Sequence, residues 1–232
     1  MDKNFYEGAK LSIPACLGVF PVGISIGLLA VQNGFTRMEI IFMSLMVMAG
    51  SAELMAISLF SQGISYPLIV LGTFFINLRH IVMSSSAMFY IKKTPLYKRM
   101  IAAFALCDES FAIFSLSDNK NYSFLLGANT ALYTTFVGST VIGTFMTHYL
   151  PKIITDSFGI AFYSAFLGML IPSVKGKRSL TILVILTALI NQGLQFFISP
   201  SYSIILSMIG GAFIGVFIVN EDEKGTEKEE SK

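Results

Sequence analysis

An arginine and a histidine stand side by side inside a long apolar stretch of the sequence. Arg79 and His80 lie within residues 65–91, where the other side chains are almost all apolar, small or hydroxyl-bearing. An arginine in the core of a bilayer costs about 2.5–3.5 kcal/mol on insertion scales, so another group must compensate its charge. A guanidinium can give a carboxylate two hydrogen bonds, and a histidine can exchange a proton near neutral pH. The two residues therefore predict a binding or proton-coupling site.

Three carboxylates in other apolar stretches are candidates to face Arg79. Glu53 is the single charged residue of the run 49–53 in the middle of its stretch, and Asp108 and Glu109 interrupt a later, shorter one. Arg79 can pair with Glu53 or Asp108 and simply hold helices together, or it can bind a substrate. A buried glutamate can also carry a coupling proton. From the residues alone, the structural and the functional interpretation both remain open.

The helix expected to carry Arg79 presents polar groups on two faces. Asn77 and His80 are three residues apart and share one face, while Arg79 is turned from His80 by about 100°. Polar groups on two faces of a membrane helix require neighbouring helices on both sides or a water-filled cavity. Asn77 is therefore a further candidate for the site.

Two short sequences predict interruptions of helices near this site. Pro21 removes a backbone hydrogen bond within the first apolar stretch and Gly23 follows it, so a kink or break is predicted there. Gly50 and Ser51 predict a second break, directly before Glu53. Free amides at such breaks can bind a carboxylate, and free carbonyls can bind a cation. A small zwitterion would use both.

Composition sets the fold class in which these residues must be placed. The 232 residues are 54% hydrophobic and 13% charged, with a mean hydropathy of +0.70. Ordinary globular domains carry about 25% charged residues. Apolar stretches separated by short polar loops predict an all-α, polytopic helical membrane protein of seven or eight segments, some broken or re-entrant. We expect one transmembrane domain over 1–219 and a charged, disordered tail over 220–232.

Two basic loops constrain how the segments cross the membrane. Residues 92–99 and 175–178 are rich in lysine and arginine, and both are expected on the cytoplasmic side. Three full spans between them would place the loops on opposite sides. One segment is therefore expected to be re-entrant or half-crossing, and the short acidic stretch at 100–116 is the first candidate.

Enzymatic, metal-dependent and nucleic-acid functions find no support in the sequence. It contains no G-x-S-x-G, H-E-x-x-H or Walker A motif. Its two cysteines and two histidines are not spaced as metal ligands, so no metal or other cofactor is expected. A net charge of +2 does not indicate nucleic-acid binding.

Four runs of residues carry a resemblance to a known family. In chain order they are PVGISIGLLA, AGSAELMAISL, FFINLRHIVMSSSA and LCDESFAI, and they fall within residues 21–113. The sequence there resembles the AzlC family, the large subunits of branched-chain amino acid exporters. The resemblance implies a multi-pass permease of the bacterial inner membrane that exports valine, leucine, isoleucine or analogues. It also implies a small AzlD-like membrane subunit as partner.

The residues themselves lead only to a polar mid-membrane site for a small zwitterion or ion. On that basis the chain is a secondary transporter, and a permease for another small solute is a variant of the same interpretation. The alternative is a non-transporting scaffold or accessory subunit whose charges dock a partner. An intramembrane enzyme ranks last, because no catalytic constellation is present. The site residues predicted for transport are Gly50, Ser51, Glu53, Asn77, Arg79, His80, Asp108 and Glu109.

Overall fold

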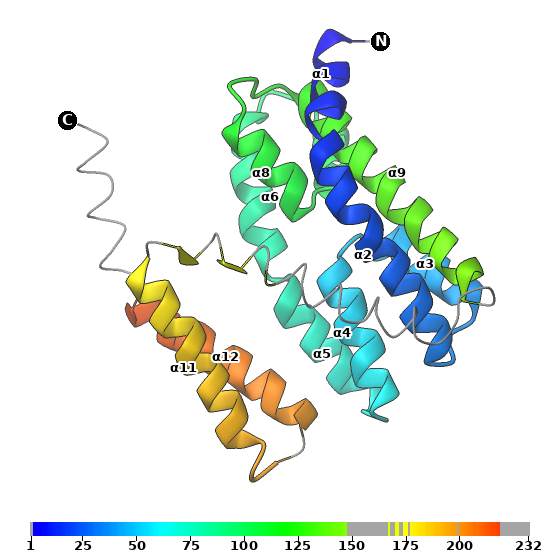
Figure 1. Cartoon of the computed structure of the whole chain (residues 1–232). Coiled ribbons are helices and arrows are strands. Elements are labelled where there is room, and N and C mark those ends of the chain that lie inside the picture. The colour runs from blue at the N-terminus through cyan, green and yellow to red at the C-terminus, as the bar shows by residue number, and fades with distance from the viewer. Residues whose placement is uncertain are drawn as a thin grey trace. The chain divides into compact units, whose positions relative to one another are not determined.

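The chain folds into α-helices grouped in two compact units. The computed structural model describes residues 2–147, 167, 170–171, 174–175, 177–198 and 200–218, and every regular element in these ranges is an α-helix (Figure 1). The units are Met1–Ala165 and Phe166–Lys232. The tail predicted at 220–232 lies outside the described residues.

The first unit contains the predicted site residues. Its described helices are α1 (Lys3–Leu11), α2 (Ile13–Gln32), α3 (Arg37–Val47), α4 (Gly50–Ser61), α5 (Tyr66–Asn77), α6 (Arg79–Tyr90), α7 (Leu96–Phe104), α8 (Asp108–Leu116) and α9 (Tyr122–Met146). The most extensive packing joins α2 to α9, and α1 extends the same packing along α9.

Two stretches of helix in the described residues are long and apolar enough to cross a membrane. They are Ile13–Gln32 and Tyr66–Tyr90, which combines α5 and α6. Of the kink or break predicted at Pro21 and Gly23, the break does not occur, because α2 runs through both residues. Membrane helices tolerate an internal proline, and α2 packs along α9 over much of its length. The total of seven or eight segments stays a prediction.

Residues 37–61 form an antiparallel hairpin of α3 and α4, which reverses directly before the interruption predicted at Gly50 and Ser51. The chain reverses at Met48, which has a left-handed φ of 48°, and at Ala49. Phe35, before α3, stacks on Phe60 near the end of α4 with ring centroids 4.6 Å apart. Helices of this length are too short to cross a bilayer, which takes about 20 residues.

Helices α7 and α8 form a second antiparallel hairpin, and its direction follows from contacts with α9. On α7, Lys98 lies over the Tyr122 ring at 5.6 Å and Ala102 accepts a hydrogen bond from Asn129, so α7 runs parallel to α9. On α8, Phe114 contacts Phe124, so α8 runs antiparallel to α9. This is the geometry that a re-entrant segment requires.

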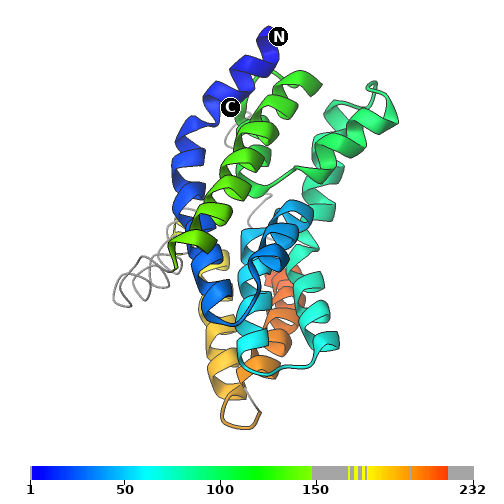
Figure 2. The ribbon, with the colours of Figure 1, turned by 90° about the vertical axis from the view of Figure 1, so that its right-hand side faces the viewer.

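The two hairpins enter the unit from opposite ends. The connections before α7 and after α8 lie beside the start of α1, where Asn119 donates hydrogen bonds to Asn4 and Glu7. The connections before α3 and after α4 lie at the other end, where Phe60 contacts both Phe35 and Tyr66. Figure 2 shows the two hairpins reaching toward the same level of the unit.

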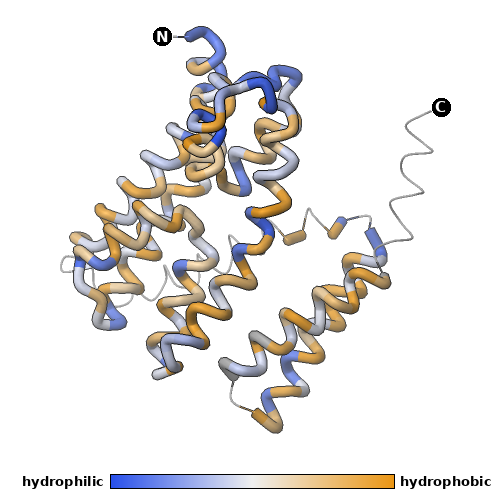
Figure 3. Tube along the Cα trace, turned by 180° about the vertical axis from the view of Figure 1, so that it is seen from behind, coloured by the Kyte–Doolittle hydropathy of each residue, from blue (hydrophilic) through white to orange (hydrophobic). Residues whose placement is uncertain are grey.

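Small residues allow α2 and α9 to pack backbone against backbone. A Cβ atom at Gly27 would collide with the Thr140 carbonyl, and one at Gly143 would collide with the Ile24 carbonyl. Such close approach is typical of membrane helices, where small residues bring backbones together. Many large apolar side chains of the same helices face outward, and Figure 3 shows apolar residues along most of their length.

Replacement of Gly143 by alanine is expected to destabilise the α2–α9 packing. The new methyl group overlaps backbone atoms of Ile24, which cannot move without separating the helices, so we expect a loss of about 3 kcal/mol. Gly138→Ala is the matched control, because no atom lies within 4 Å of its Cβ position on the same helix. Thermal unfolding of both variants in detergent measures the difference, and equal melting temperatures would contradict the packing.

The second unit contains a helical hairpin of α11 (Arg178–Leu194) and α12 (Pro200–Ile218). The Ser203 hydroxyl donates to the carbonyl and side-chain oxygens of Asn191 at 2.6 and 2.7 Å, which joins the helices near their connection. Gly211 lies against Thr187 and lets them approach. An open, mostly apolar groove of about 520 Å³ runs along the pair.

Candidate functional site

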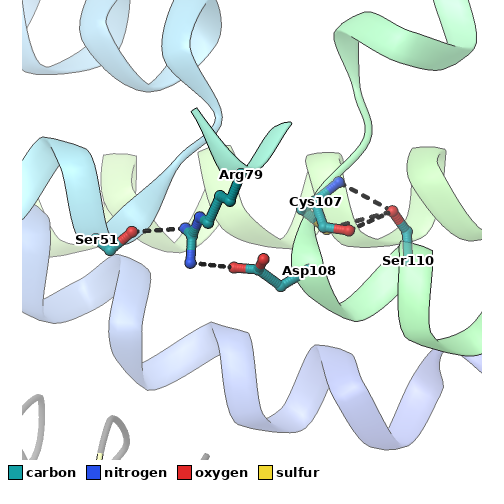
Figure 4. Close-up of polar contacts among 5 residues, drawn as sticks. All are labelled: Ser51, Arg79, Cys107, Asp108 and Ser110. Atoms are coloured by element: carbon teal, nitrogen blue, oxygen red, sulfur yellow. Dashed lines mark hydrogen bonds and ion pairs between the residues drawn. The ribbon is translucent and has the colours of Figure 1, made fainter. Parts of the chain in front are cut away.

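The Arg79 guanidinium lies where the tips of the two hairpins meet (Figure 4). Its Nη1 atom pairs with Asp108 Oδ2 at 2.8 Å, and its Nη2 atom donates to Ser51 Oγ at 2.6 Å. Ser51 belongs to the first turn of α4, and Asp108 is the first residue of α8. The arginine thus connects both hairpins to the long α5–α6 stretch.

Two helices begin at this point. Helix α4 begins at Gly50 and α8 at Asp108, whereas α6 continues α5 through the helical residue Leu78. The N-termini of α4 and α8 each carry unpaired amides and a partial positive charge, so their convergence favours an anion. Asp108 supplies the opposite charge. The combination of a guanidinium, two helix N-termini and one carboxylate can bind both ends of a zwitterion.

The start of α8 is fixed by a local cap. The Cys107 backbone amide donates to Ser110 Oγ at 3.0 Å, and the Ser110 hydroxyl donates to the Cys107 carbonyl at 3.1 Å (Figure 4). Both side chains are buried, so the cap is held in the core. It orients the first turn of α8 and keeps the Asp108 carboxylate directed at Arg79.

Three side-chain atoms at or near Arg79 in the sequence have no hydrogen-bond partner among the described residues. Arg79 Nε, Asn77 Oδ1 and His80 Nε2 are buried atoms without a hydrogen-bond partner there. The side chains of Arg79 and Asp108 are nevertheless 33% and 30% exposed. A solute can therefore approach the ion pair, and Arg79 Nε is a donor still available there.

Three other predicted site residues, His80, Glu109 and Gly50, make contacts of their own around the hairpin tips. His80 is next to Arg79, and its ring interacts with the Leu106 backbone in the α7–α8 connection. Glu109 lies beside Cys107. Gly50 packs near Phe136 on α9, so it serves the packing of α4.

Glu53 does not face Arg79. Its side chain is 1% exposed, and its Oε2 atom accepts a hydrogen bond from the Ser44 hydroxyl at 2.7 Å. The alternative in which Arg79 pairs with Glu53 is therefore wrong, and Asp108 is the partner. The hairpin explains the difference, because Glu53 lies two residues beyond Ser51 and turns toward the other leg, α3.

Comparison with known proteins identifies the family. The sequence profile of the AzlC protein family matches residues 14–150, which include Ser51, Arg79 and Asp108. The chain belongs to the AzlC family. No solved structure matches it.

Relatives within and near the AzlC family are named as membrane or transport proteins. An uncharacterized membrane protein of Archaeoglobus fulgidus is 33% identical over 75% of this chain and 78% of its own length. The inner membrane protein YgaZ of Escherichia coli is 27% identical over 77% of each chain. The branched-chain amino acid transport protein AzlC of Bacillus subtilis is 33% identical over 47% of this chain and 42% of its own. The chain is accordingly an AzlC-family membrane protein.

Two residues of α9 support the site in this AzlC-family chain, and sequence reasoning did not select them. The Asn129 amide donates to the Ala102 carbonyl at 2.8 Å, and the Tyr133 hydroxyl donates to the Leu45 carbonyl at 2.8 Å. Both carbonyls belong to the last turns of α7 and α3, which lack partners within their own helices. Their spacing of four residues on one helix face is the signal that could have identified them.

Replacement of Tyr133 by phenylalanine is expected to weaken the α3–α4 hairpin. It leaves the Leu45 carbonyl without its donor, which costs about 1–2 kcal/mol. We expect a lower melting temperature in detergent. Tyr97→Phe is the control, because Tyr97 is 61% exposed. If the two variants unfold at the same temperature, Tyr133 does not hold the hairpin.

Proposed function

We propose that this chain is a secondary transporter that exports branched-chain amino acids across the bacterial cytoplasmic membrane. The observation that carries the proposal is the Arg79–Asp108 pair, which lies partly exposed at the meeting point of two helical hairpins. An amino acid carries the same two charges in complementary positions. The name of the Bacillus subtilis relative, a branched-chain amino acid transport protein, supports the substrate class.

In the proposed cycle, the substrate replaces the internal ion pair. Its carboxylate takes the two Arg79 donors now directed at Asp108 and Ser51, and its ammonium group takes the Asp108 carboxylate. Each charge released from the pair finds a new partner, so the exchange costs little electrostatic energy. In this cycle the substrate is bound and released, and no covalent bond is made or broken.

The opposed hairpins provide a route to alternating access. Helices α3–α4 reach Arg79 from one end of the unit, and α7–α8 reach it from the other. Movement of one hairpin tip away from Arg79 would open the site to one side while the other stays closed. Transporters commonly place their substrate between such discontinuous helices near the midplane.

The proposal includes a multi-pass arrangement in the cytoplasmic membrane and a small AzlD-like membrane subunit. Support for the location comes from the Escherichia coli relative, which is named an inner membrane protein. The partner follows from the family resemblance. Expression of the chain with and without the small subunit separates a requirement for the partner from the activity itself.

A second candidate is an accessory or scaffold subunit that does not transport. The observation in its favour is that Asp108 already compensates Arg79 within the chain, so the pair can be purely structural. In that case purified protein should show no thermal stabilisation by any branched-chain amino acid.

An export assay tests the proposed function. Cells that produce the chain and its small partner are supplied with valine-containing dipeptides, and intracellular valine is measured over time. We expect a lower steady-state level than in cells without the chain. Unchanged valine, leucine and isoleucine levels at comparable amounts of inserted protein would contradict the proposal.

A further inference from the structure

Among the residues that the structure describes, Glu53 is a fully buried carboxyl group without a positive partner. Its side chain is 1% exposed, Oε2 accepts from Ser44, and Oε1 has no hydrogen-bond partner among the described residues. No ion pair in the described part of the chain involves Glu53. A buried carboxylate in such surroundings is strongly disfavoured, and the usual solution is that the group takes up a proton.

The elements packed against α4 offer no compensating charge close to Glu53. Helices α2, α3 and α5 pack on α4, and the α7–α8 tip shares the same buried cluster. The titratable groups on these elements and on the facing part of α9 are Cys16 on α2, Arg37 and Glu39 at the start of α3, Tyr66 at the start of α5, Cys107 at the α8 cap, Asp108 and Glu109 on α8, and Tyr133 on α9. On α6, Arg79 donates to Ser51 of α4 but forms its ion pair with Asp108 and not with Glu53, and His80 follows it in the chain. Arg37 and Glu39 are exposed at the far end of α3.

We propose that Glu53, hydrogen-bonded to Ser44, is the proton-binding site that couples transport to the proton gradient. This inference rests on the proposed function and names its coupling ion. The proton resides on Oε1, while Oε2 keeps the hydrogen bond from Ser44. During the cycle Glu53 releases the proton to water on one side of the membrane and takes one up from the other, and no other bond changes.

The hairpin connects the proton site to the substrate site. Ser44 and Glu53 lie on opposite legs, on either side of the reversal at Met48 and Ala49. Ser51, two residues before Glu53, holds Arg79. A neutral Glu53 fits between the legs, whereas an ionised Glu53 must reach water or a positive charge. Loss of the proton therefore disturbs the same hairpin that contacts Arg79 through Ser51, whereas substrate exchange proceeds while Glu53 stays protonated.

The donor set fits a proton better than a metal ion. Sodium and calcium ions take about six oxygen ligands, whereas the described contacts of Glu53 supply its own carboxyl group and one serine hydroxyl. No group of three His, Cys, Asp or Glu side chains within the described residues could hold a metal ion. A metal cation at Glu53 would also be surrounded by apolar side chains, which cannot coordinate it.

Flux measurements and infrared spectroscopy test this site together. The full chain with its small partner is reconstituted in vesicles that contain a pH-sensitive dye. In the wild type we expect an imposed leucine gradient to change the internal pH. Glu53→Gln should keep leucine counterflow, which needs no net proton movement, and lose the leucine-driven pH change. The infrared band of a protonated carboxylic acid should be present in the wild type and absent from Glu53→Gln.

The controls separate this inference from the proposed function. Glu39→Gln should keep both the pH change and the infrared band, because glutamine preserves the capping box with Thr36. If Glu53→Gln does not fold, Ser44→Ala should still shift the band by removing its hydrogen bond. A pH change that persists in Glu53→Gln, or leucine flux that requires sodium, overturns the proposal while counterflow upholds transport. Absent counterflow in the wild type refutes the proposed function and this inference with it.

Discussion

Replacement of Arg79 by alanine is expected to abolish leucine transport while the protein still inserts and folds. The change removes two charge-assisted donors from the substrate carboxylate, which is worth about 3 kcal/mol, or roughly 100-fold in affinity. It also leaves Asp108 without its partner at 2.8 Å. Initial rates of leucine counterflow, normalised to the amount of folded protein, measure the effect.

Two further arginine variants make this result specific. Arg79→Lys keeps the charge but loses the planar pair of donors, so we expect activity between those of the wild type and Arg79→Ala. Arg37→Ala removes an exposed arginine at the start of α3, where it lies 4.8 Å from the Phe145 ring, and should transport normally. Retained counterflow in Arg79→Ala would refute the assignment of Arg79 to the substrate site.

Replacement of Asp108 by asparagine is expected to have the second largest effect. It keeps the shape of the side chain and removes the charge that the substrate ammonium would pair with, so we expect transport to fall by about tenfold or more. It also leaves the partly exposed Arg79 uncompensated. Asp118→Asn is the matched control, because Asp118 is exposed in the α8–α9 connection and should tolerate the same change.

A charge exchange separates substrate binding from a structural ion pair. The double variant Arg79→Asp with Asp108→Arg restores a pair of opposite charges between α6 and α8. If the pair only holds helices together, the double variant should recover the function that either single variant loses. We expect it to recover stability but not transport, because each substrate end would meet a charge in the wrong position.

The residues of the site could be predicted from the sequence because charge inside an apolar stretch is costly. Arg79, Glu53 and Asp108 stand out for this reason without any knowledge of the fold. The sequence could not decide which carboxylate faces Arg79, since both are distant in sequence and either is chemically suitable. The reversal at Met48 decides it by turning Glu53 toward α3.

The hairpins were harder to predict than the long helices. Gly50 and Ser51 indicated an interruption, but the chain reverses at Met48, which has a left-handed backbone conformation. This conformation costs about 1–2 kcal/mol for a residue with a side chain, so a methionine in the sequence does not predict it. At Pro21 the sequence suggested an interruption where α2 is continuous, because α2 packs along α9. The supporting roles of Asn129 and Tyr133 depend on where α3 and α7 end, which only the fold defines.

The most direct test of the central claim asks whether the site recognises both ends of an amino acid. Vesicles that contain the chain and its small partner are loaded with leucine, isoamylamine or isocaproate, and uptake of labelled leucine is measured. Isoamylamine lacks the carboxylate that Arg79 would bind, and isocaproate lacks the ammonium group that Asp108 would bind. We expect counterflow with leucine and none with either analogue. Counterflow with one analogue as fast as with leucine would contradict the claim.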